Sequence, residues 1–261
     1  MVPLIDTTVD GHVHTRLCKH AVGEMEEYVE QAVRRGLTTV CFLEHLETDI
    51  AYQPPCWLDD DEFAYYFEEG LRLKERYRGV VAVRLGVEMG CNPAAIDAIR
   101  HRLKRYPIER IGLSCHFHQH GLSHLNLLSR RPQSLDRLAA IGADAVISTY
   151  FATLIKAVAS LDCDVLCHLD AVLRHLPGIT FNNEHRGQIA QLLDAMQGKD
   201  IALEINTSGF DYRGSAFPAP WIISAALERG IRLEAGSDAH HPSEVGRYFD
   251  QLPHYLEPLC R

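Results

Sequence analysis

The sequence predicts an α/β fold, a distorted seven-stranded parallel (β/α)7 barrel of the TIM-like type. Seven short apolar runs, typical of buried strands, recur along the chain. Segments with the period of an amphipathic helix lie between several of these runs, as in a parallel sheet. Six of the seven runs lead to a His, Asp or Glu, and functional side chains gather at the carboxyl ends of barrel strands.

The predicted strands, in chain order, span residues 4–13, 38–43, 80–87, 108–115, 163–167, 201–205 and 231–235. The first predicted helix has apolar side chains at helical spacing, at Met25, Tyr28, Val29, Ala32 and Val33. A later helix has them at Ile189, Leu192, Leu193 and Met196, and is expected to end at Gly198. Pro132 and Pro218 stand where two further helices could begin, because proline suits the first helical turn.

An open, doubly wound sheet is the alternative architecture. Such a sheet binds its ligand in one crevice, where the strand order reverses. Polar side chains after nearly every strand fit a closed barrel better, since all of them then surround one mouth. The chain has 261 residues, with no repeat, linker or low-complexity tract, so we expect a single domain over 1–261.

The composition limits the partners and the compartment. The net charge of −9 opposes binding of long nucleic acid, because there is no excess of Lys and Arg to neutralise phosphates. A small phosphorylated substrate is still compatible, since metal ions in a cleft can reverse the local sign. No run approaches the roughly 18 apolar residues of a membrane helix, and the N-terminus lacks the pattern of a signal peptide. We therefore expect a cytoplasmic protein with no membrane partner.

The eight cysteines are scattered along the chain, and several lie inside apolar runs. Disulfides are not expected in a cytoplasmic chain of this size. Cys163 and Cys167 could form a metal-binding pair, but they fall within a predicted strand. Buried free thiols are therefore the preferred interpretation.

Several strand ends carry side chains that bind metal ions. His12 and His14 are two residues apart in a predicted strand, so both imidazoles face the same side and can reach one ion. Glu44 and His45 close the second strand, and of the two the imidazole is the preferred ligand. Later strands lead to Glu88, His116 and His168, and a loop histidine, His20, follows the first strand.

The segment Gly236-Ser237-Asp238-Ala239-His240 completes the set. Its small residues let the backbone turn, so that Asp238 and His240 both point into the site. An oxygen ligand beside nitrogen ligands suits a catalytic metal site more than a structural one. Seven histidines with Glu88 and Asp238 make nine candidates. Since one open site takes about three protein ligands, nine suit two or three divalent ions such as Zn, Fe or Mn.

Such a metal cluster suits a metal-dependent phosphatase. Clustered ions lower the pKa of a shared water and clamp the oxygens of a phosphoryl group. Glu88 is then the candidate bridge between two ions, because a carboxylate has two oxygens to offer. Glu88 and Asp238 are the candidate catalytic residues. Asp170, His118 and His120 are candidate proton donors to the leaving group, and His124 completes a histidine-rich stretch after His116.

Segments spread over nearly the whole chain carry a family resemblance. They are 10–15, 18–21, 25–28, 168–170 with Arg174, 204–209 and 236–240. In these segments the chain resembles the PHP (polymerase and histidinol phosphatase) superfamily, and more narrowly its histidinol-phosphatase branch. Two places depart from the family pattern. Leu43-Glu44-His45 stands where the family usually has Thr or Ser, then Asp and His, and the segment 117–131 is unlike the family after His116.

The resemblance implies a distorted seven-stranded barrel with three metal ions. One ion would be held by His12, His14, Glu88 and Asp238, the second by Glu88, His116 and His168, and the third by His20, His45 and His240. The resemblance also implies that Arg174 and Arg213 bind the phosphate group. The unusual segment 117–131 is expected to help bind the alcohol part of the substrate.

The expected activity is hydrolysis of L-histidinol phosphate to L-histidinol and phosphate, in histidine biosynthesis. The alternative is another phosphoesterase of the superfamily, acting on nucleotides or nucleic-acid ends. A catalytically silent metal-binding module is disfavoured by the full set of nine ligands. A metal-dependent amidohydrolase shares the two early histidines and the late aspartate, but it does not account for His20, His45 and Glu88 together.

Overall fold

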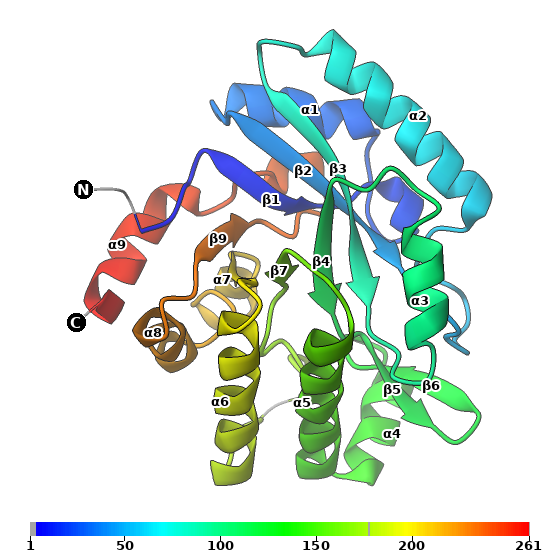
Figure 1. Cartoon of the computed structure of the whole chain (residues 1–261), viewed down its shortest axis with the longest axis vertical. Coiled ribbons are helices and arrows are strands. Elements are labelled where there is room, and N and C mark those ends of the chain that lie inside the picture. Colours follow the sequence, from blue (N-terminus) through cyan, green and yellow to red (C-terminus); the bar gives the residue numbers. More distant parts are fainter. Residues whose placement is uncertain (1–3, 177, 261) are drawn as a thin grey trace.

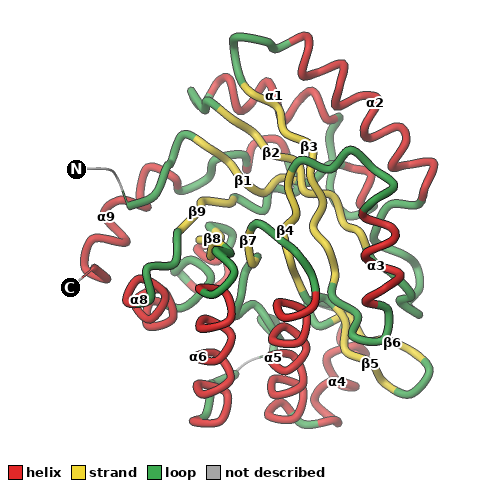
Figure 2. Tube along the Cα trace, in the orientation of Figure 1, coloured by secondary structure: helices red, strands yellow, loops and turns green. Residues whose placement is uncertain are grey.

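The computed structural model of the protein describes residues 4–176 and 178–260. Seven parallel strands form one sheet in the order β1-β2-β3-β4-β7-β8-β9 (Figures 1 and 2). They are β1 (Val9–Val13), β2 (Thr39–Leu46), β3 (Ala82–Gly90), β4 (Arg110–Ser114), β7 (Val165–Leu166), β8 (Ala202–Asn206) and β9 (Leu233–Gly236). Each predicted strand contains or overlaps one of them, so the predicted seven-stranded parallel barrel is confirmed.

The sheet closes on itself between its first and last strands. Val13 pairs with Ala239 in a parallel bridge just beyond the end of β9. The N–H of His14 donates to the carbonyl of Ala239 at 3.0 Å, and the N–H of Asp238 donates to the carbonyl of His12 at 2.9 Å. The barrel is distorted, because β7 has only two residues and the register of β1 shifts between Asp10 and Val13.

Helices surround the strands (Figure 1). They are α1 (Met25–Arg34), α2 (Asp60–Arg76), α3 (Ile96–Leu103), α4 (Pro132–Ile141), α5 (Ala143–Ser160), α6 (Asn183–Gln197), α7 (Gly209–Arg213), α8 (Pro220–Glu228) and α9 (Leu252–Leu256). Short 3-10 helices span Arg16–Cys18, Pro242–Glu244, Phe249–Gln251 and Glu257–Cys260. A separate antiparallel hairpin, β5 (Phe117–His120) and β6 (Ser123–Asn126), follows β4.

The predicted helix signals are confirmed with one exception. α1 covers the predicted residues and opens on a capping box between Glu24 and Glu27, while α6 ends just before Gly198. Pro132 is the first residue of α4. The prediction for Pro218 is wrong, because α8 begins at Pro220. The reason is that Phe217 pairs with a β8 residue in an antiparallel bridge, which keeps this segment extended.

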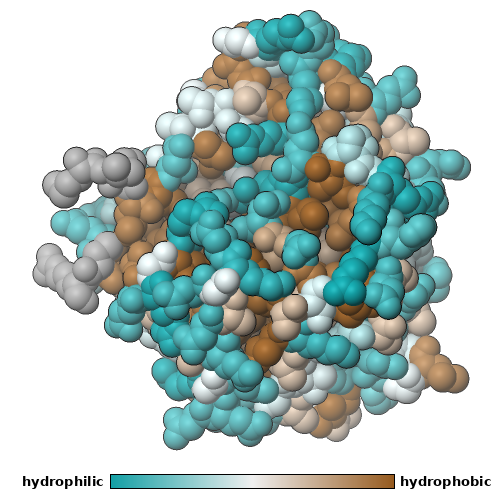
Figure 3. Space-filling model, viewed as in Figure 1, coloured by the Kyte–Doolittle hydropathy of each residue, from teal (hydrophilic) through white to brown (hydrophobic). Residues whose placement is uncertain are grey.

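One large apolar core fills the space between the sheet and the helices. No single helix in the described ranges is long and apolar enough to cross a membrane. The pair α4 and α5, bent by 89°, meets the length and composition criterion only when taken together. α5 buries seven side chains and lies beside α6. The face drawn in Figure 3 is mainly hydrophilic, with smaller hydrophobic groups in between.

Seven cysteines are free thiols in this structure, Cys163 and Cys167 among them. Cys167 is buried and Cys163 is half-buried. The expectation of free thiols is therefore confirmed for both members of the pair. The side chain of Cys260 lies outside the described residues.

Gly86 on β3 is a test of how tightly the barrel is packed. A Cβ at this position would lie 2.4 Å from the carbonyl oxygen of Arg110 and 2.6 Å from a methyl group of Leu43. We expect Gly86→Ala to lower the free energy of unfolding by about 1–3 kcal/mol, because backbone cannot move aside cheaply. Urea denaturation measures the change. Gly187→Ala is the matched control, because Gly187 is an exposed position of α6 where an added Cβ meets nothing within 4 Å. This change should be neutral or stabilise the protein by about 0.5–1 kcal/mol. A normal stability for Gly86→Ala would contradict the packing described.

Candidate metal centre

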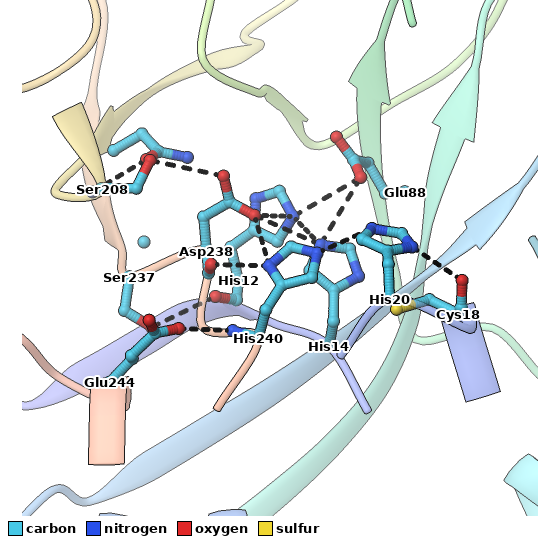
Figure 4. Close-up of polar contacts among 12 residues, drawn as sticks. His12, His14, Cys18, His20, Glu88, Ser208, Ser237, Asp238, His240 and Glu244 are labelled. Carbon is cyan, nitrogen blue, oxygen red and sulfur yellow. Dashed lines mark hydrogen bonds and ion pairs between the residues drawn. The ribbon is translucent and has the colours of Figure 1, made fainter. Parts of the chain in front are cut away.

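The nine predicted ligands meet at the carboxyl end of the barrel. Figure 4 labels His12, His14, His20, Glu88, Asp238 and His240 among them. Seven of them are buried, while His240 is half-buried and His20 is exposed. They come from strands and loops that are far apart in the sequence, from β1 to the segment after β9. The structure therefore brings together every side chain that was predicted to hold a metal ion.

Four of these side chains form the inner group, which is drawn in Figure 4. Nε2 of His12 lies 2.9 Å from Nε2 of His14. Both nitrogens lie 3.6 Å from Oε2 of Glu88. Oδ1 of Asp238 lies 3.4 Å from Nε2 of His14 and 3.9 Å from Nε2 of His12. Four ligand atoms thus surround one small volume.

Glu88 has its two oxygens in different surroundings. Its Oε1 lies 2.7 Å from Nε2 of His168 and 3.0 Å from Nε2 of His116. Its Oε2 faces the inner histidines and lies 2.9 Å from Nδ1 of His45. This arrangement suits a carboxylate that offers one oxygen to each of two ions.

The outer group contains His20, His45 and His240. The Nε2 atoms of His20 and His240 are 3.0 Å apart, and the ring of His45 lies 5.2 Å from that of His20. His45 connects this group to Glu88, because its Nδ1 lies 2.9 Å from Oε2 of that carboxylate. The buried thiol of Cys18, which the sequence did not single out, lies within 4.8 Å of ligand atoms of His14, His45 and His240.

The spacing of these atoms fits metal coordination. Ligand atoms about 2.1 Å from one ion lie about 3.0 Å apart at adjacent octahedral positions and about 3.4 Å apart at tetrahedral ones. The distances in the inner group run from 2.9 to 3.9 Å and bracket both values. Oε2 of Glu88 and Nε2 of His45 are buried and find no hydrogen-bond partner within the described chain. Buried polar atoms without a partner are costly, so these donor atoms fit a site in which they would bind a metal ion.

The charge state of the site also fits metal binding. Burial, reinforced by His45 and His240, holds the pKa of His14 well below its usual range, so its imidazole is neutral at pH 7. Burial opposes ionisation of Glu88, but the neighbouring histidines, His116 foremost, outweigh it and hold the pKa of Glu88 well below its usual range. His14 thus offers a neutral imidazole and Glu88 an ionised carboxylate, which are the forms that bind metals. At His12 and His116 burial is outweighed by neighbouring carboxylates, Glu204 and Glu88 respectively, which raise the pKa of each ring, so a metal ion would have to displace a proton there.

Two ligands sit on unusual backbone. His168 has φ of 27° and Asp238 has φ of 51°, in the left-handed region that non-glycine residues rarely adopt. Neighbouring contacts hold both of them. The N–H of His168 donates to Glu204, and the N–H of Asp238 donates across the closure to His12. Such backbone strain tends to gather at functional sites.

A cleft of about 840 Å³ opens over the cluster of candidate ligands, and Arg174 lines it. Nη1 of Arg174 lies 4.0 Å from Oδ2 of Asp238, and its guanidinium stacks over the ring of Tyr212 at 4.7 Å. Nε and Nη1 of Arg174 are buried without a hydrogen-bond partner among the described residues. A cation whose buried N–H groups make no hydrogen bond, beside a cluster of candidate metal ligands, suits an anion.

Arg213 is placed differently. Its guanidinium donates to both oxygens of Asp170, at 2.9 and 3.3 Å, and to the carbonyl of Ala216. It does not line the cleft. Asp170 is buried and also accepts from the N–H of Ala219 at 2.9 Å, so it is fully engaged. Of the other candidate proton donors, His118 and His120 belong to the β5–β6 hairpin and do not line the cleft either.

Three glutamates beside the ligands were not predicted as site residues. Glu44 is buried and accepts from the N–H of Thr15 at 2.7 Å and from its hydroxyl, which agrees with the choice of His45 as the ligand. Glu204 and Glu47 contact the rings of His12 and His116. No local pattern marks these contacts, since Glu204 and His12 are 192 residues apart in the sequence.

Comparison of the sequence with known proteins agrees with this site. A family model described as PHP domain matches residues 10–208. A relative from Deinococcus radiodurans, named "Probable histidinol-phosphatase", is 30% identical over 244 residues, which are 92% of this chain and 89% of the relative. Histidinol-phosphatase from Bacillus subtilis is 29% identical over 258 residues, which are 92% of this chain and 96% of that enzyme.

Comparison of structures agrees with the fold. A crystal structure of histidinol phosphate phosphatase from Lactococcus lactis, complexed with zinc, L-histidinol and phosphate, has a TM-score of 0.75. It is 20% identical, and the match covers 97% of this chain and 92% of that one. The two proteins therefore share their barrel. Since the matched residues 10–208 run from β1 to beyond the end of β8 and make up most of the sequence, this chain belongs to the PHP domain family.

Proposed function

We propose that this protein hydrolyses L-histidinol phosphate to L-histidinol and phosphate, a step of histidine biosynthesis. The observation that carries the proposal is the guanidinium of Arg174, whose Nε and Nη1 make no hydrogen bond within the described residues. It lies beside Asp238 in the same cleft as the cluster of candidate ligands. The relatives named as histidinol-phosphatases cover most of the chain, which supports the same activity and the same substrate.

We also propose that the site holds two or three divalent transition-metal ions, Zn, Fe or Mn. The ligands would be His12, His14, Glu88 and Asp238 for one ion, Glu88, His116 and His168 for the second, and His20, His45 and His240 for the third. When bound, the ions supply an activated water and positive charge for the phosphoryl oxygens. The structure of the Lactococcus lactis enzyme is complexed with zinc, which supports a metal site in this fold.

The chain's own side chains bind and orient the substrate. Arg174 offers its free N–H groups to the phosphate oxygens, in a fork that suits their geometry. Tyr52, Pro54 and Leu128 line the cleft beside the cluster and would contact the organic part. Leu128 lies in the segment 117–131 that departs from the family pattern, which supports a role of this segment in binding the alcohol. Binding of phosphate by Arg213 stays a prediction, and Arg213 would have to leave Asp170 to reach the cleft.

The number of metal ions is open to direct measurement. We expect at least two molar equivalents of transition metal per chain after reloading, because nine clustered ligands exceed what one ion takes. Elemental analysis of protein purified without a chelator gives the value. One equivalent or less, with activity intact, would contradict the cluster. Parallel activity assays of protein reloaded with Zn, Fe or Mn show which ion supports turnover.

A panel of phosphomonoesters tests the activity. We expect metal-loaded protein to release phosphate from L-histidinol phosphate with a higher kcat/KM than from nucleotides or nucleic-acid ends. Preference for the latter would favour the alternative phosphoesterase. No hydrolysis of any phosphoester by fully loaded protein would favour the silent metal-binding module. A cytoplasmic location and the absence of membrane and long nucleic-acid partners stay predictions.

A further inference from the structure

Glu204 is fixed behind the ring of His12. Its Oε1 lies 2.6 Å from Nδ1 of His12. Its Oε2 accepts from the N–H of His168 at 2.7 Å and from Nδ2 of Asn206 at 3.1 Å. Both oxygens of this buried carboxylate are therefore held, and Nε2 of His12 is left to face the inner group.

Glu47 repeats the arrangement behind His116. Its Oε1 lies 2.8 Å from Nδ1 of His116, while Nε2 of the same ring faces Glu88. A glycine makes room for each carboxylate. A Cβ on Gly90 would lie 1.9 Å from Glu47, and a Cβ on Gly236 would lie 2.2 Å from Glu204. The glycines on β3 and β9 thus leave the space in which each buried glutamate reaches its histidine.

The outer histidines have a weaker partner at the same ring position. Nδ1 of His20 contacts the carbonyl of Cys18 at 2.7 Å, and Nδ1 of His240 contacts the carbonyl of Asp238 at 3.0 Å. A carbonyl can orient a ring as a carboxylate does, but it brings no full negative charge. A charged partner makes the other ring nitrogen a better electron donor to a metal.

We propose that Glu204 and Glu47 are positioning residues that hold His12 and His116 with the proton on Nδ1 and the lone pair on Nε2. The inner positions of the centre thereby bind metal more tightly than the outer position of His20 and His240. This inference rests on the proposed metal centre. It concerns how the ligands are held, and not which phosphoester the enzyme cleaves.

The test uses Glu204→Gln and Glu47→Gln in the full chain. Glutamine keeps the size of the side chain and an acceptor oxygen but removes the charge. We expect zinc affinity, measured by competition with a chromophoric chelator, to fall about 10- to 100-fold for the tightly bound ions. The weakest class of ion should change little. Equal affinity of parent and variants for every ion would overturn the proposal.

Glu234→Gln is the matched control. Glu234 is the register partner of Glu204 on β9, and it pairs with Arg110 and Arg232 instead of a histidine. Its loss removes a glutamate charge from the next strand, so zinc affinity should stay at the parent value. A fall as large as that in Glu204→Gln would show a general effect of charge or stability, and would overturn the specific role.

A second measurement needs no substitution. In zinc-loaded parent protein labelled with ¹⁵N in its histidine rings, two rings should carry a proton on Nδ1 that is shifted far downfield by a carboxylate partner. Unprotonated Nδ1 atoms in His12 and His116 would overturn the proposal even if the variants fail to fold. Failure of the parent to bind zinc at all would instead contradict the metal centre, so the two proposals fail in different ways.

Discussion

Glu88→Gln should lower kcat on the order of 100-fold or more. The reason is that it removes the charge from a side chain that faces both the inner histidines and the pair His116 and His168. Oε1 of Glu88 faces His116 and His168, and its Oε2 faces the inner histidines. A neutral amide would leave two cations close together with less negative charge between them. Steady-state hydrolysis of L-histidinol phosphate by reloaded protein measures the loss.

Metal analysis of the same variant separates two causes. Loss of one ion per chain would show that the fall in kcat comes from weaker metal binding. Full metal content with low turnover would show that it comes from weaker activation of water. Glu109→Gln is the control, since Glu109 bonds the N–H of Leu85 and Lys74 away from the cluster. It should keep parent kcat. Near-normal turnover in Glu88→Gln with normal metal content would contradict the bridging role.

Arg174→Met should lower kcat/KM by about 10- to 150-fold, since hydrogen bonds to charged groups contribute roughly 1.5–3 kcal/mol each. The change removes the guanidinium that lies beside Asp238 and stacks over Tyr212, and it keeps an unbranched apolar side chain in its place. Metal content should stay unchanged, because Arg174 is not a proposed ligand. Inhibition by inorganic phosphate should weaken in parallel.

Arg213→Met is the matched comparison. Its guanidinium bonds Asp170 and Ala216, so its loss should mainly lower the free energy of unfolding. A loss of phosphate inhibition as large as in Arg174→Met would instead support direct binding by Arg213. If Arg174→Met hydrolyses L-histidinol phosphate as well as the parent, the phosphate site is misplaced. The substrate would then have to lie elsewhere in the cleft, nearer the segment 117–131.

The strands and the ligands could be predicted because their signals are local. A buried strand needs a short apolar run, and a ligand at its end follows directly in the sequence, as at His12 and His14 or at His168. The closed barrel then brings these ends together, whatever their distance along the chain. The grouping of the nine candidate side chains could therefore be predicted from the order of strands and the chemistry of His, Asp and Glu, while their roles as ligands stay a prediction.

The supporting contacts could not be predicted in the same way. Glu204 looks like an ordinary strand residue and Glu47 like an ordinary loop residue after β2. Their partners depend on the register of strands and on the space left by Gly236 and Gly90. The prediction of a helix start at Pro218 was wrong for a related reason. The bridge between Phe217 and Asn206 keeps the backbone extended there, which outweighs the preference of proline for the first helical turn. The partner of Arg213 likewise lies 43 residues away, on another loop.

The closure of the barrel between β1 and the segment after β9 also has a consequence for synthesis on the ribosome. His12 is made early, yet the backbone bonds that join it to Asp238 and join His14 to Ala239 require residues made more than 220 positions later. Asp238 and His240 also emerge last of the nine ligands. A growing chain thus lacks two of the nine proposed ligands until β9 and the segment after it have left the ribosomal tunnel, and the proposed centre can be completed only in the last stage of folding.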